Sequence, residues 1–217
     1  MLIIEVNFKK REYIGSGAEG DVYDFTTKSG KLPSGVIKLY NLGSYSGGLR
    51  RLQTKYETQS KYPELFAKVY RIRPGSANPN TAYVVMEKLD TAKLSKAIEA
   101  LQSSIKKVIK DNTSILKFTE PYKSLYNRYR SDFLGGMYEE IVEDGNTDFI
   151  DFIKDNLSSS QLNVLNKLEE YIYKIKNVAK DLFDKFNFLD IHSNNIGVDG
   201  SGNIKMFDFV TLSDVKN

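Results

Sequence analysis

The sequence predicts an α+β protein in which a small antiparallel sheet with one helix is followed by a mostly helical part. Residues 11–87 contain short runs that alternate apolar and polar side chains, separated by Gly, Pro and Asn, and this pattern is typical of strands and turns. Residues 91–186 instead repeat apolar side chains at intervals of three and four, which is typical of amphipathic helices. The chain has 217 residues, 41% of them hydrophobic, so it can bury a substantial core.

Alternation and turn-forming residues mark the strands of the first part. After a glycine-rich hairpin whose second strand covers 21–27, we expect strands at 35–40, 66–72 and 82–89. A helix at 49–60 is expected between the first two of these. The first part is therefore predicted to be a small sheet with one helix.

The second part contains one long helix whose apolar stripe we interpret as core rather than as a cofactor site. The chain then ends in a hairpin, with strands at 195–198 and 203–207 joined by an Asp-Gly-Ser-Gly turn. Helix signals between 111 and 155 are mixed and are broken by Pro121 and by three glycines. The stripe consists of Leu162, Leu165, Leu168, Ile172, Ile175, Ala179, Leu182 and Phe186.

The amino-acid composition indicates which kinds of partner and cellular location to expect. Thirty-one basic and 28 acidic residues leave a net charge of +3, which is too small to indicate binding to nucleic acid or to a membrane surface. Cysteine is absent, so neither a disulfide framework nor a cysteine zinc site is expected. No run of about 18 apolar residues and no leader-like segment is found, so we expect a cytoplasmic protein that is neither exported nor membrane-spanning.

Three glycines in the stretch GSGAEGDV fit the pattern G-x-G-x-x-G at Gly15, Gly17 and Gly20. Two unrelated kinds of fold use this pattern: in dinucleotide-binding proteins the third glycine opens a helix, whereas in kinases the glycines lie in a hairpin of two strands. The residues after Gly20 alternate with a period of two, so they favour the hairpin. An ordinary structural hairpin rich in glycine is the alternative.

Lys38 is a candidate for binding phosphate. It lies eighteen positions after Gly20, between apolar neighbours in the strand expected at 35–40. In that setting it either faces solvent or, beside a glycine loop, binds phosphate groups. A phosphate-binding lysine needs an acidic partner, and Glu57 in the following helix is the candidate. The other interpretation of Glu57 is a solvated glutamate on the helix surface.

Three oxygen-bearing side chains near the end of the chain form a candidate metal and catalytic set. In the stretch LDIHSNNIG, Asp190 and Asn195 are five positions apart, and Asp208 follows the last expected strand. Carboxylate and amide oxygens are the ligands that Mg²⁺ prefers in proteins. Together with a lysine and a glycine loop, they are consistent with one phosphate site.

These motifs occur in the order in which the protein-kinase-like superfamily has them, and they extend from Gly15 to Phe209, so the chain resembles a member of that superfamily. The resemblance implies a bilobal fold, with an N-lobe at 1–88 and a C-lobe at 89–217 that holds a helical insertion at about 91–155. It also implies ATP and Mg²⁺ as cofactors.

By the same resemblance, Lys38 and Glu57 would form the ion pair that holds the phosphates, Asp190 would take the proton of the acceptor hydroxyl, and Asn195 and Asp208 would bind Mg²⁺. The nucleotide would lie against the glycine loop and the hinge strand. The residues expected to contact it besides Lys38 are Gly15, Ser16, Gly17, Gly20, Val22, Val36, Met86, Glu87 and Leu89.

The sequence also departs from typical protein kinases. His192 makes the catalytic loop D-x-H-x-x-N, which resembles aminoglycoside and choline kinases; it either faces phosphate or only hydrogen-bonds the loop. Phe209-Val210 replaces Phe-Gly, and from this we expect a more fixed loop. Only residues 210–217 follow, so the usual activation segment is not expected, and the extra helices at about 91–155 are expected to border the acceptor site.

Three functions are consistent with this pattern. The leading one is a serine/threonine protein kinase that transfers the γ-phosphate of ATP to a hydroxyl group of a protein substrate. The alternatives are a small-molecule kinase similar to aminoglycoside and choline kinases, and an ATP-binding pseudokinase that acts as an interaction module. The D-x-H-x-x-N loop favours a small acceptor, whereas the complete glycine loop and the hinge resemble protein kinases.

Overall fold

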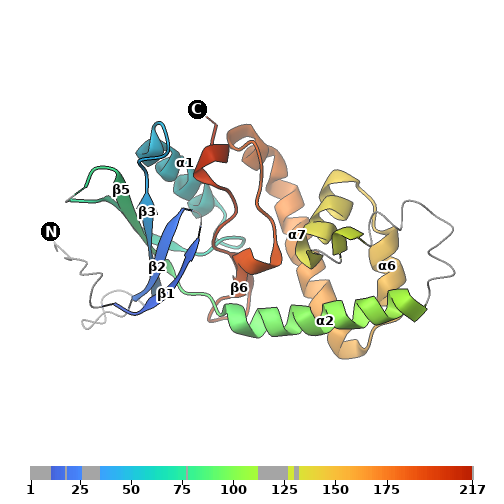
Figure 1. Ribbon diagram of the computed structural model, residues 1–217. Coiled ribbons are helices and arrows are strands. Elements are labelled where there is room, and N and C mark those ends of the chain that lie inside the picture. Colours follow the sequence, from blue (N-terminus) through green and yellow to red (C-terminus); the bar gives the residue numbers. More distant parts are fainter. Residues whose placement is uncertain are drawn as a thin grey trace. The chain divides into compact units, whose positions relative to one another are not determined.

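The computed structural model describes residues 11–216 with the exception of 18, 26–34, 77, 112–126 and 130–131. Its described residues form an α+β structure, as the sequence predicts (Figure 1). They divide into two compact units. Unit 1 comprises the described residues of Met1–Lys88 and Val210–Asn217, and unit 2 comprises those of Leu89–Phe209.

Unit 1 is built on a five-stranded sheet in which every neighbouring pair of strands is antiparallel. The strand order β1-β2-β3-β5-β4 places β3 and β5 at its centre (Figure 1, blue to green). The strand expected at 66–72 begins later, because Phe66 and Ala67 are buried in the irregular segment before it. The strands are β1 (Tyr13–Gly17), β2 (Gly20–Phe25), β3 (Gly35–Asn41), β4 (Val69–Pro74) and β5 (Thr81–Glu87).

Helix α1 (Gly48–Lys61) contributes one face to the core of unit 1. Leu52 and Tyr56 are fully buried, and the Tyr56 hydroxyl hydrogen-bonds that of Tyr40 on β3. Gln59 donates from Nε2 to the carbonyl oxygen of Ala67 at 2.7 Å, so the end of α1 is bonded to the segment before β4. Apolar packing and a few buried polar bonds therefore hold α1 in unit 1.

The end of the chain belongs to unit 1, not to the helical part that the expected division at residue 88 assigned it to. Its short 3-10 helix η4 (Leu212–Asp214) has a buried leucine, and Val215 is buried as well. Arg51 of α1 donates from Nη1 to the carbonyl oxygens of Leu212 at 3.0 Å and Val215 at 2.6 Å. Because these contacts are made 161 or more positions apart, local sequence patterns did not indicate them.

Unit 2 contains the long helices and a short hairpin. Its helix α7 (Ser159–Lys185) begins with a capping box of Ser158 and Gln161 and buries most of the apolar stripe predicted for it, which confirms that the stripe is core. None of the helices among the described residues is long and apolar enough to cross a membrane. The other elements are α2 (Thr91–Asp111), α5 (Phe133–Tyr138), the π-helix η2 (Glu139–Glu143), α6 (Asp148–Lys154), the 3-10 helix η3 (Ser193–Asn195), β6 (Ile196–Val198) and β7 (Ile204–Met206).

Strands β6 and β7 form the hairpin that was expected near the end of the chain. Asp199 closes its turn, since its carboxylate accepts hydrogen bonds from the backbone N–H groups of Ser201 and Asn203. Burial would raise the pKa of Asp199, but these bonds and that of Lys205 outweigh it and lower the pKa to about 2. Gly197 lies so close to α2 that an added Cβ would stand 2.7 Å from the Cβ of Leu89.

Candidate functional site

The glycine stretch forms the antiparallel hairpin that its alternation predicted. Gly17 of β1 pairs with Gly20 of β2, and Gly15 pairs with Val22, so the third glycine begins a strand and not a helix. Gly20 has a φ of +152°, and a Cβ there would stand 1.8 Å from the carbonyl oxygen of Leu39. Only glycine fits this position, because the backbones of β2 and β3 approach each other too closely for a side chain.

Lys38 lies on β3 and is buried, with 7% of its surface exposed, so the solvent-facing interpretation is wrong. Its Cα pairs with that of Val22 on β2, which places it beside the glycine hairpin. The ammonium group is 3.4 Å from Oε2 of Glu19 and 4.8 Å from the ring centre of Tyr40. Glu19 comes from the glycine stretch itself, between β1 and β2.

Glu19 is the centre of a buried ionic cluster. It is 5% exposed, and the Oε2 atom that lies near Lys38 also accepts a hydrogen bond from Nζ of Lys55 at 2.9 Å. Lys55 lies on α1 and is 0% exposed. The other carboxylate oxygen, Oε1, accepts from the backbone N–H of Leu212. One carboxylate therefore connects the glycine stretch, β3, α1 and the C-terminal segment.

The pair expected between Lys38 and Glu57 is not formed. Glu57 is exposed, and none of the ion pairs in the described part of the chain includes it. Successive helical residues are 100° apart, so Glu57 is turned about 200° away from the buried Lys55. The sequence does contain a signal that could have shown this, namely the spacing of residues along the helix. Positions three and four apart lie on the same face, and the buried face of α1 carries Leu52, Lys55, Tyr56 and Gln59.

Burying this cluster is costly unless its charges stay paired, because ions leave water when they enter the core. The ammonium groups of two lysines meet one glutamate here, near a glycine hairpin in which a Cβ at Gly15 or Gly17 would meet nothing within 4 Å. Backbone N–H groups together with a positive charge form a suitable environment for an anion.

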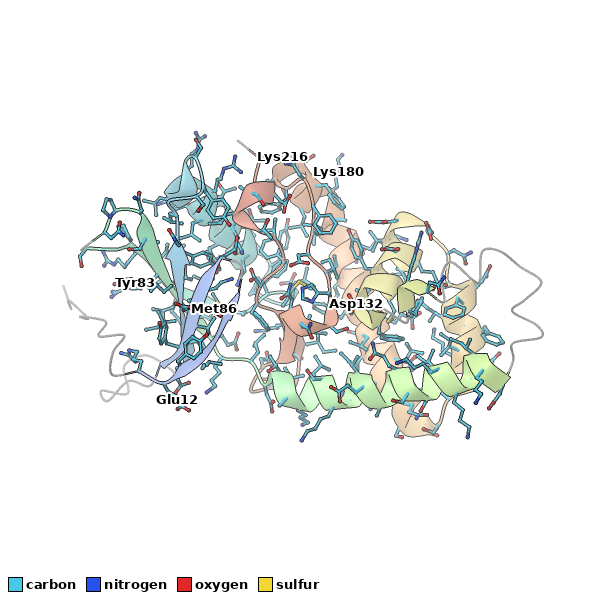
Figure 2. The ribbon with its side chains drawn as sticks, in the orientation of Figure 1. Glu12, Tyr83, Met86, Asp132, Lys180 and Lys216 are labelled. Atoms are coloured by element: carbon cyan, nitrogen blue, oxygen red, sulfur yellow. The ribbon has the colours of Figure 1, made fainter. Side chains whose placement is uncertain are left out.

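Of the residues expected at the adenine, Val36, Met86 and Glu87 are on the same sheet. Val36 of β3 pairs with Met86 of β5, and Met86 is buried (Figure 2). The backbone N–H of Glu87 donates to the carbonyl oxygen of Lys68 at 2.8 Å, so that amide is used within unit 1. Leu89 belongs to unit 2 and lies against Gly197.

Asp190 and Asn195 are brought together in unit 2, as their spacing suggested. Asn195 donates from Nδ2 to the backbone oxygen of Asp190 at 3.1 Å and to its Oδ2 at 3.2 Å. Two backbone bonds hold the Asp208 segment beside this pair: Asp190 N–H donates to Phe209 O at 2.7 Å, and Phe207 N–H donates to Asn195 O at 3.0 Å. The residues on both sides of Asp208 are thus bonded to the two ends of the Asp190–Asn195 loop.

Asn195 and Asp208 are the residues here that could hold a divalent cation. The amide nitrogen of Asn195 is used by Asp190, and its Oδ1 accepts no hydrogen bond from the described residues. Mg²⁺ is usually held by one or two protein oxygens together with phosphate and water. Within the described ranges, no group of three or more His, Cys, Asp and Glu side chains could hold a metal without such help.

His192 has a structural contact on one nitrogen and faces Asp190 with the other. Its Nδ1 accepts a hydrogen bond from the N–H of Asn194 at 3.2 Å, at the start of η3. The neutral ring then carries its proton on Nε2, which is 3.4 Å from Oδ2 of Asp190. This geometry agrees with the loop-bonding interpretation, and it also places a donor beside the candidate base.

Phe209, the residue after Asp208, is fully buried in unit 2. Its ring packs edge to face against Phe186, with the two ring centres 5.3 Å apart. This contact attaches the residue after Asp208 to the end of α7. The position of Asp208 is therefore defined by packing as well as by backbone bonds.

Two cavities of unit 2 lie along this loop. One, of about 490 Å³, lies between α2 and His192, and the other, of about 260 Å³, includes Asp190. Asp132, at the start of α5 (Figure 2), lines both. It accepts from the N–H of Gly135 and from the N–H and hydroxyl of Ser193, so it attaches η3 to α5.

Comparison with known proteins adds no relative: no family model matches the sequence, and no curated protein is significantly similar to it.

Proposed function

We propose that this chain is an ATP- and Mg²⁺-dependent phosphotransferase of the protein-kinase-like superfamily, with unit 1 as its N-lobe and unit 2 as its C-lobe. The observation that carries the proposal is the bonding of Asp190 and Asn195 to each other and to both neighbours of Asp208. In this proposal the arrangement supplies a base, Asp190, and two metal-ligand oxygens, those of Asn195 and Asp208, which is what phosphoryl transfer needs from a protein.

In this proposal unit 1 binds the nucleotide. Lys38 contacts the phosphates, and Glu19 replaces Glu57 as the carboxylate that orients it. The backbone of the glycine hairpin covers the phosphates, while Val22, Val36 and Met86 pack against adenine. A lysine oriented by a buried carboxylate supplies positive charge without reorganising when negative charge develops in the transition state.

Unit 2 supplies the reacting groups. Asp190 orients the acceptor hydroxyl and accepts its proton, and His192, whose Nε2 lies 3.4 Å from Oδ2 of Asp190, keeps that carboxylate in place. Asn195 Oδ1 and Asp208 would hold Mg²⁺. The chemistry that the ion supplies when bound is neutralisation of the charge on the phosphates.

We propose a hydroxyl group of serine or threonine in a protein as the acceptor, with a small alcohol as the alternative. The glycine hairpin resembles that of protein kinases, whereas His192 resembles the small-molecule branch. A coupled assay for ADP with a mixed protein acceptor and with a panel of small alcohols distinguishes them. Turnover with the alcohols and none with the protein would favour the alternative.

The experiment that tests phosphoryl transfer uses ATP labelled at the γ-position. Wild type and Asp208→Ala are each incubated with labelled ATP and Mg²⁺, with and without a generic protein acceptor. Label is expected on acceptor or enzyme with the wild type and not with Asp208→Ala. Equal labelling by both proteins, or no labelling and no ATP hydrolysis by the wild type, would contradict an enzymatic function and leave the pseudokinase.

A further inference from the structure

The smaller cavity in unit 2 has no role in the functions described so far. Its volume is about 260 Å³, and it is lined by residues of α5, of η2 and of the segment that leads to Asp190. Asp190 is itself one of the lining residues. A group bound in this cavity would therefore lie beside the carboxylate that is proposed to accept the hydroxyl proton.

The lining of this cavity is strongly acidic, with four carboxylates and one guanidinium group, that of Arg128. Arg128 already forms ion pairs from Nε with Glu139 at 2.7 Å and from Nη1 with Asp144 at 3.2 Å. Its charge is therefore shared between two carboxylates. A negative charge remains at the cavity, and a cation entering it would offset that charge.

Glu143, at the end of η2, is the lining carboxylate with the fewest partners. Its carboxylate takes part in no hydrogen bond or ion pair in the described part of the chain, and the residue as a whole is exposed. Partial burial raises the pKa of Glu143, and the charges of Glu139 and Asp144 raise it further, against a weaker opposite effect of Arg128. These like charges show that Glu143 lies in a negative field.

A second, independent observation is the hydroxyl group of Tyr138, another lining residue. Tyr138 is 5% exposed, and its hydroxyl oxygen is buried without a hydrogen-bond partner among the described residues. Buried polar groups are nearly always bonded, because an unsatisfied one loses the bonds it made with water. Burial and then the charge of Glu143 raise the pKa of Tyr138, so the hydroxyl stays protonated.

Phe188, two positions before Asp190, also lines the cavity. Its ring is 60% exposed, the largest exposed fraction among the large hydrophobic side chains of the described residues. The face of an aromatic ring attracts cations. An exposed ring, a neutral hydroxyl and several carboxylates are the groups that recognise an ammonium or guanidinium ion.

We propose that this cavity binds a cationic group, an ammonium or a guanidinium, carried by the molecule that accepts the phosphate. The inference rests on the proposed phosphotransferase function, and it adds that the acceptor molecule carries a positive charge. Because ligand sites usually measure about 300–1,000 Å³, a cavity of about 260 Å³ holds one group of the acceptor and not all of it. The cation anchors the acceptor, and its hydroxyl is presented to Asp190.

The chemical step leaves the cation unchanged. The acceptor oxygen forms a bond to the γ-phosphorus as the bond between that phosphorus and the β,γ-bridging oxygen breaks, and ADP leaves with the bonding electrons. The hydroxyl proton passes to Asp190. A basic side chain near a serine in a peptide and the amine of an amino alcohol supply the same chemistry, so the experiment compares both sources.

The binding arm is run without ATP, so that it does not depend on catalysis. Titration calorimetry or NMR compares the peptide Arg-Ala-Ser-Ala-Arg with Glu-Ala-Ser-Ala-Glu, and ethanolamine with ethylene glycol. The basic probe of at least one pair is expected to bind about tenfold or more tightly than its partner. Equal binding within both pairs would overturn the proposal, and selectivity in only one pair would identify the source of the cation.

Two variants locate the effect. Glu143→Gln is expected to weaken binding of the selected basic probe by about tenfold, while the matched control Glu170→Gln, on exposed α7 surface and paired with Lys174, leaves it unchanged. Tyr138→Phe is expected to weaken the same binding without lowering stability, because its hydroxyl has no partner in the protein. Unchanged binding in both variants, or a Tyr138→Phe protein that is less stable but binds normally, would overturn the proposal.

A second experiment measures phosphoryl transfer by the wild type and Glu143→Gln. Its outcomes distinguish a failure of this inference from a failure of the proposed phosphotransferase function. Charge-selective binding that depends on Glu143, without any phosphoryl transfer, would support the cationic site and contradict the phosphotransferase. Transfer to the basic acceptors at the same KM in wild type and Glu143→Gln would contradict the cationic site and support the enzyme. An increase in the acceptor KM of Glu143→Gln with an unchanged KM for ATP would support both.

Discussion

The charged groups of the two candidate regions are held in opposite ways. In unit 1 the Glu19–Lys38–Lys55 cluster is buried, and every contact described for it is made inside the core. In unit 2 Asp190 and His192 are each partly exposed and lie at the wall of a cavity. Removing one partner of a buried ion pair leaves an uncompensated charge and destabilises the fold, whereas exposed charged groups can be changed with little effect on folding. Variants of the first region should therefore unfold more easily, and variants of the second should fail mainly in chemistry.

The largest effect is expected for Glu19→Gln. The substitution leaves two buried lysines without their shared carboxylate, and breaking a buried ion pair typically costs about 3–5 kcal/mol. Urea unfolding measures the loss, with Glu57→Gln as the control, because Glu57 is exposed and should change the free energy of unfolding by less than about 0.5 kcal/mol. Equal effects of the two variants would contradict Glu19 as the shared buried partner of Lys38 and Lys55.

A smaller loss of stability is expected in unit 2 from Gly197→Ala. The new Cβ would stand 2.7 Å from the Cβ of Leu89, and overpacking of this kind costs about 1–3 kcal/mol. Gly200→Ala is the matched control, since nothing lies within 4 Å of a Cβ there. Thermal unfolding compares the two. Equal melting temperatures of the two variants would mean that β6 does not pack against the start of α2 as described.

Arg51→Ala tests whether the C-terminal segment is part of the cluster in unit 1. It removes the bonds to the carbonyl oxygens of Leu212 and Val215 and is expected to cost about 1–2 kcal/mol, with exposed Arg50→Ala as the control. Because Leu212 N–H donates to Glu19, hydrogen exchange of that amide should speed up in Arg51→Ala. Exchange as slow as in Arg50→Ala would show that Arg51 does not hold the segment.

A pH-dependent effect is expected from Asp199 in the turn of the β6–β7 hairpin. Asp199 has a pKa of about 2, below its ordinary value of 3.8, so it stabilises the folded state above pH ~4 and loses that contribution as the pH falls towards 2. Asp199→Asn should therefore have a lower free energy of unfolding than the wild type at pH 6. At pH 2 the difference between the two proteins should be smaller. A difference that stays constant between these two pH values would contradict the lowered pKa.

Local patterns predicted the parts of the fold that depend on local contacts. The alternation of apolar and polar residues predicted β3 and the hairpin of β6 and β7, and apolar residues three and four positions apart predicted α7. Such predictions succeed because the spacing of apolar residues along an element shows which of its faces is buried. The antiparallel glycine hairpin followed from the same reasoning.

The ionic partner of Lys38 could not be predicted in this way. Glu19 and Lys38 are nineteen positions apart and meet only because the chain reverses direction in the sheet, and Leu212 reaches Glu19 from the other end of the sequence. Glu57 was chosen for its residue type and its place in the helix. The phase of α1 would have shown that Lys55, and not Glu57, faces the core. The last two residues of the strand expected at 21–27 lie outside the described residues.

The most direct measurement of the central claim is the rate of phosphoryl transfer by Asp190→Asn, with its stability measured on the same sample. The amide can still accept the hydrogen bond from Asn195 but cannot act as the base. We expect the free energy of unfolding to change by less than about 1 kcal/mol and the rate to fall by about 10²–10⁴-fold, the usual contribution of general base catalysis. A variant as active as the wild type would contradict the assignment of Asp190 and, with it, this account of unit 2.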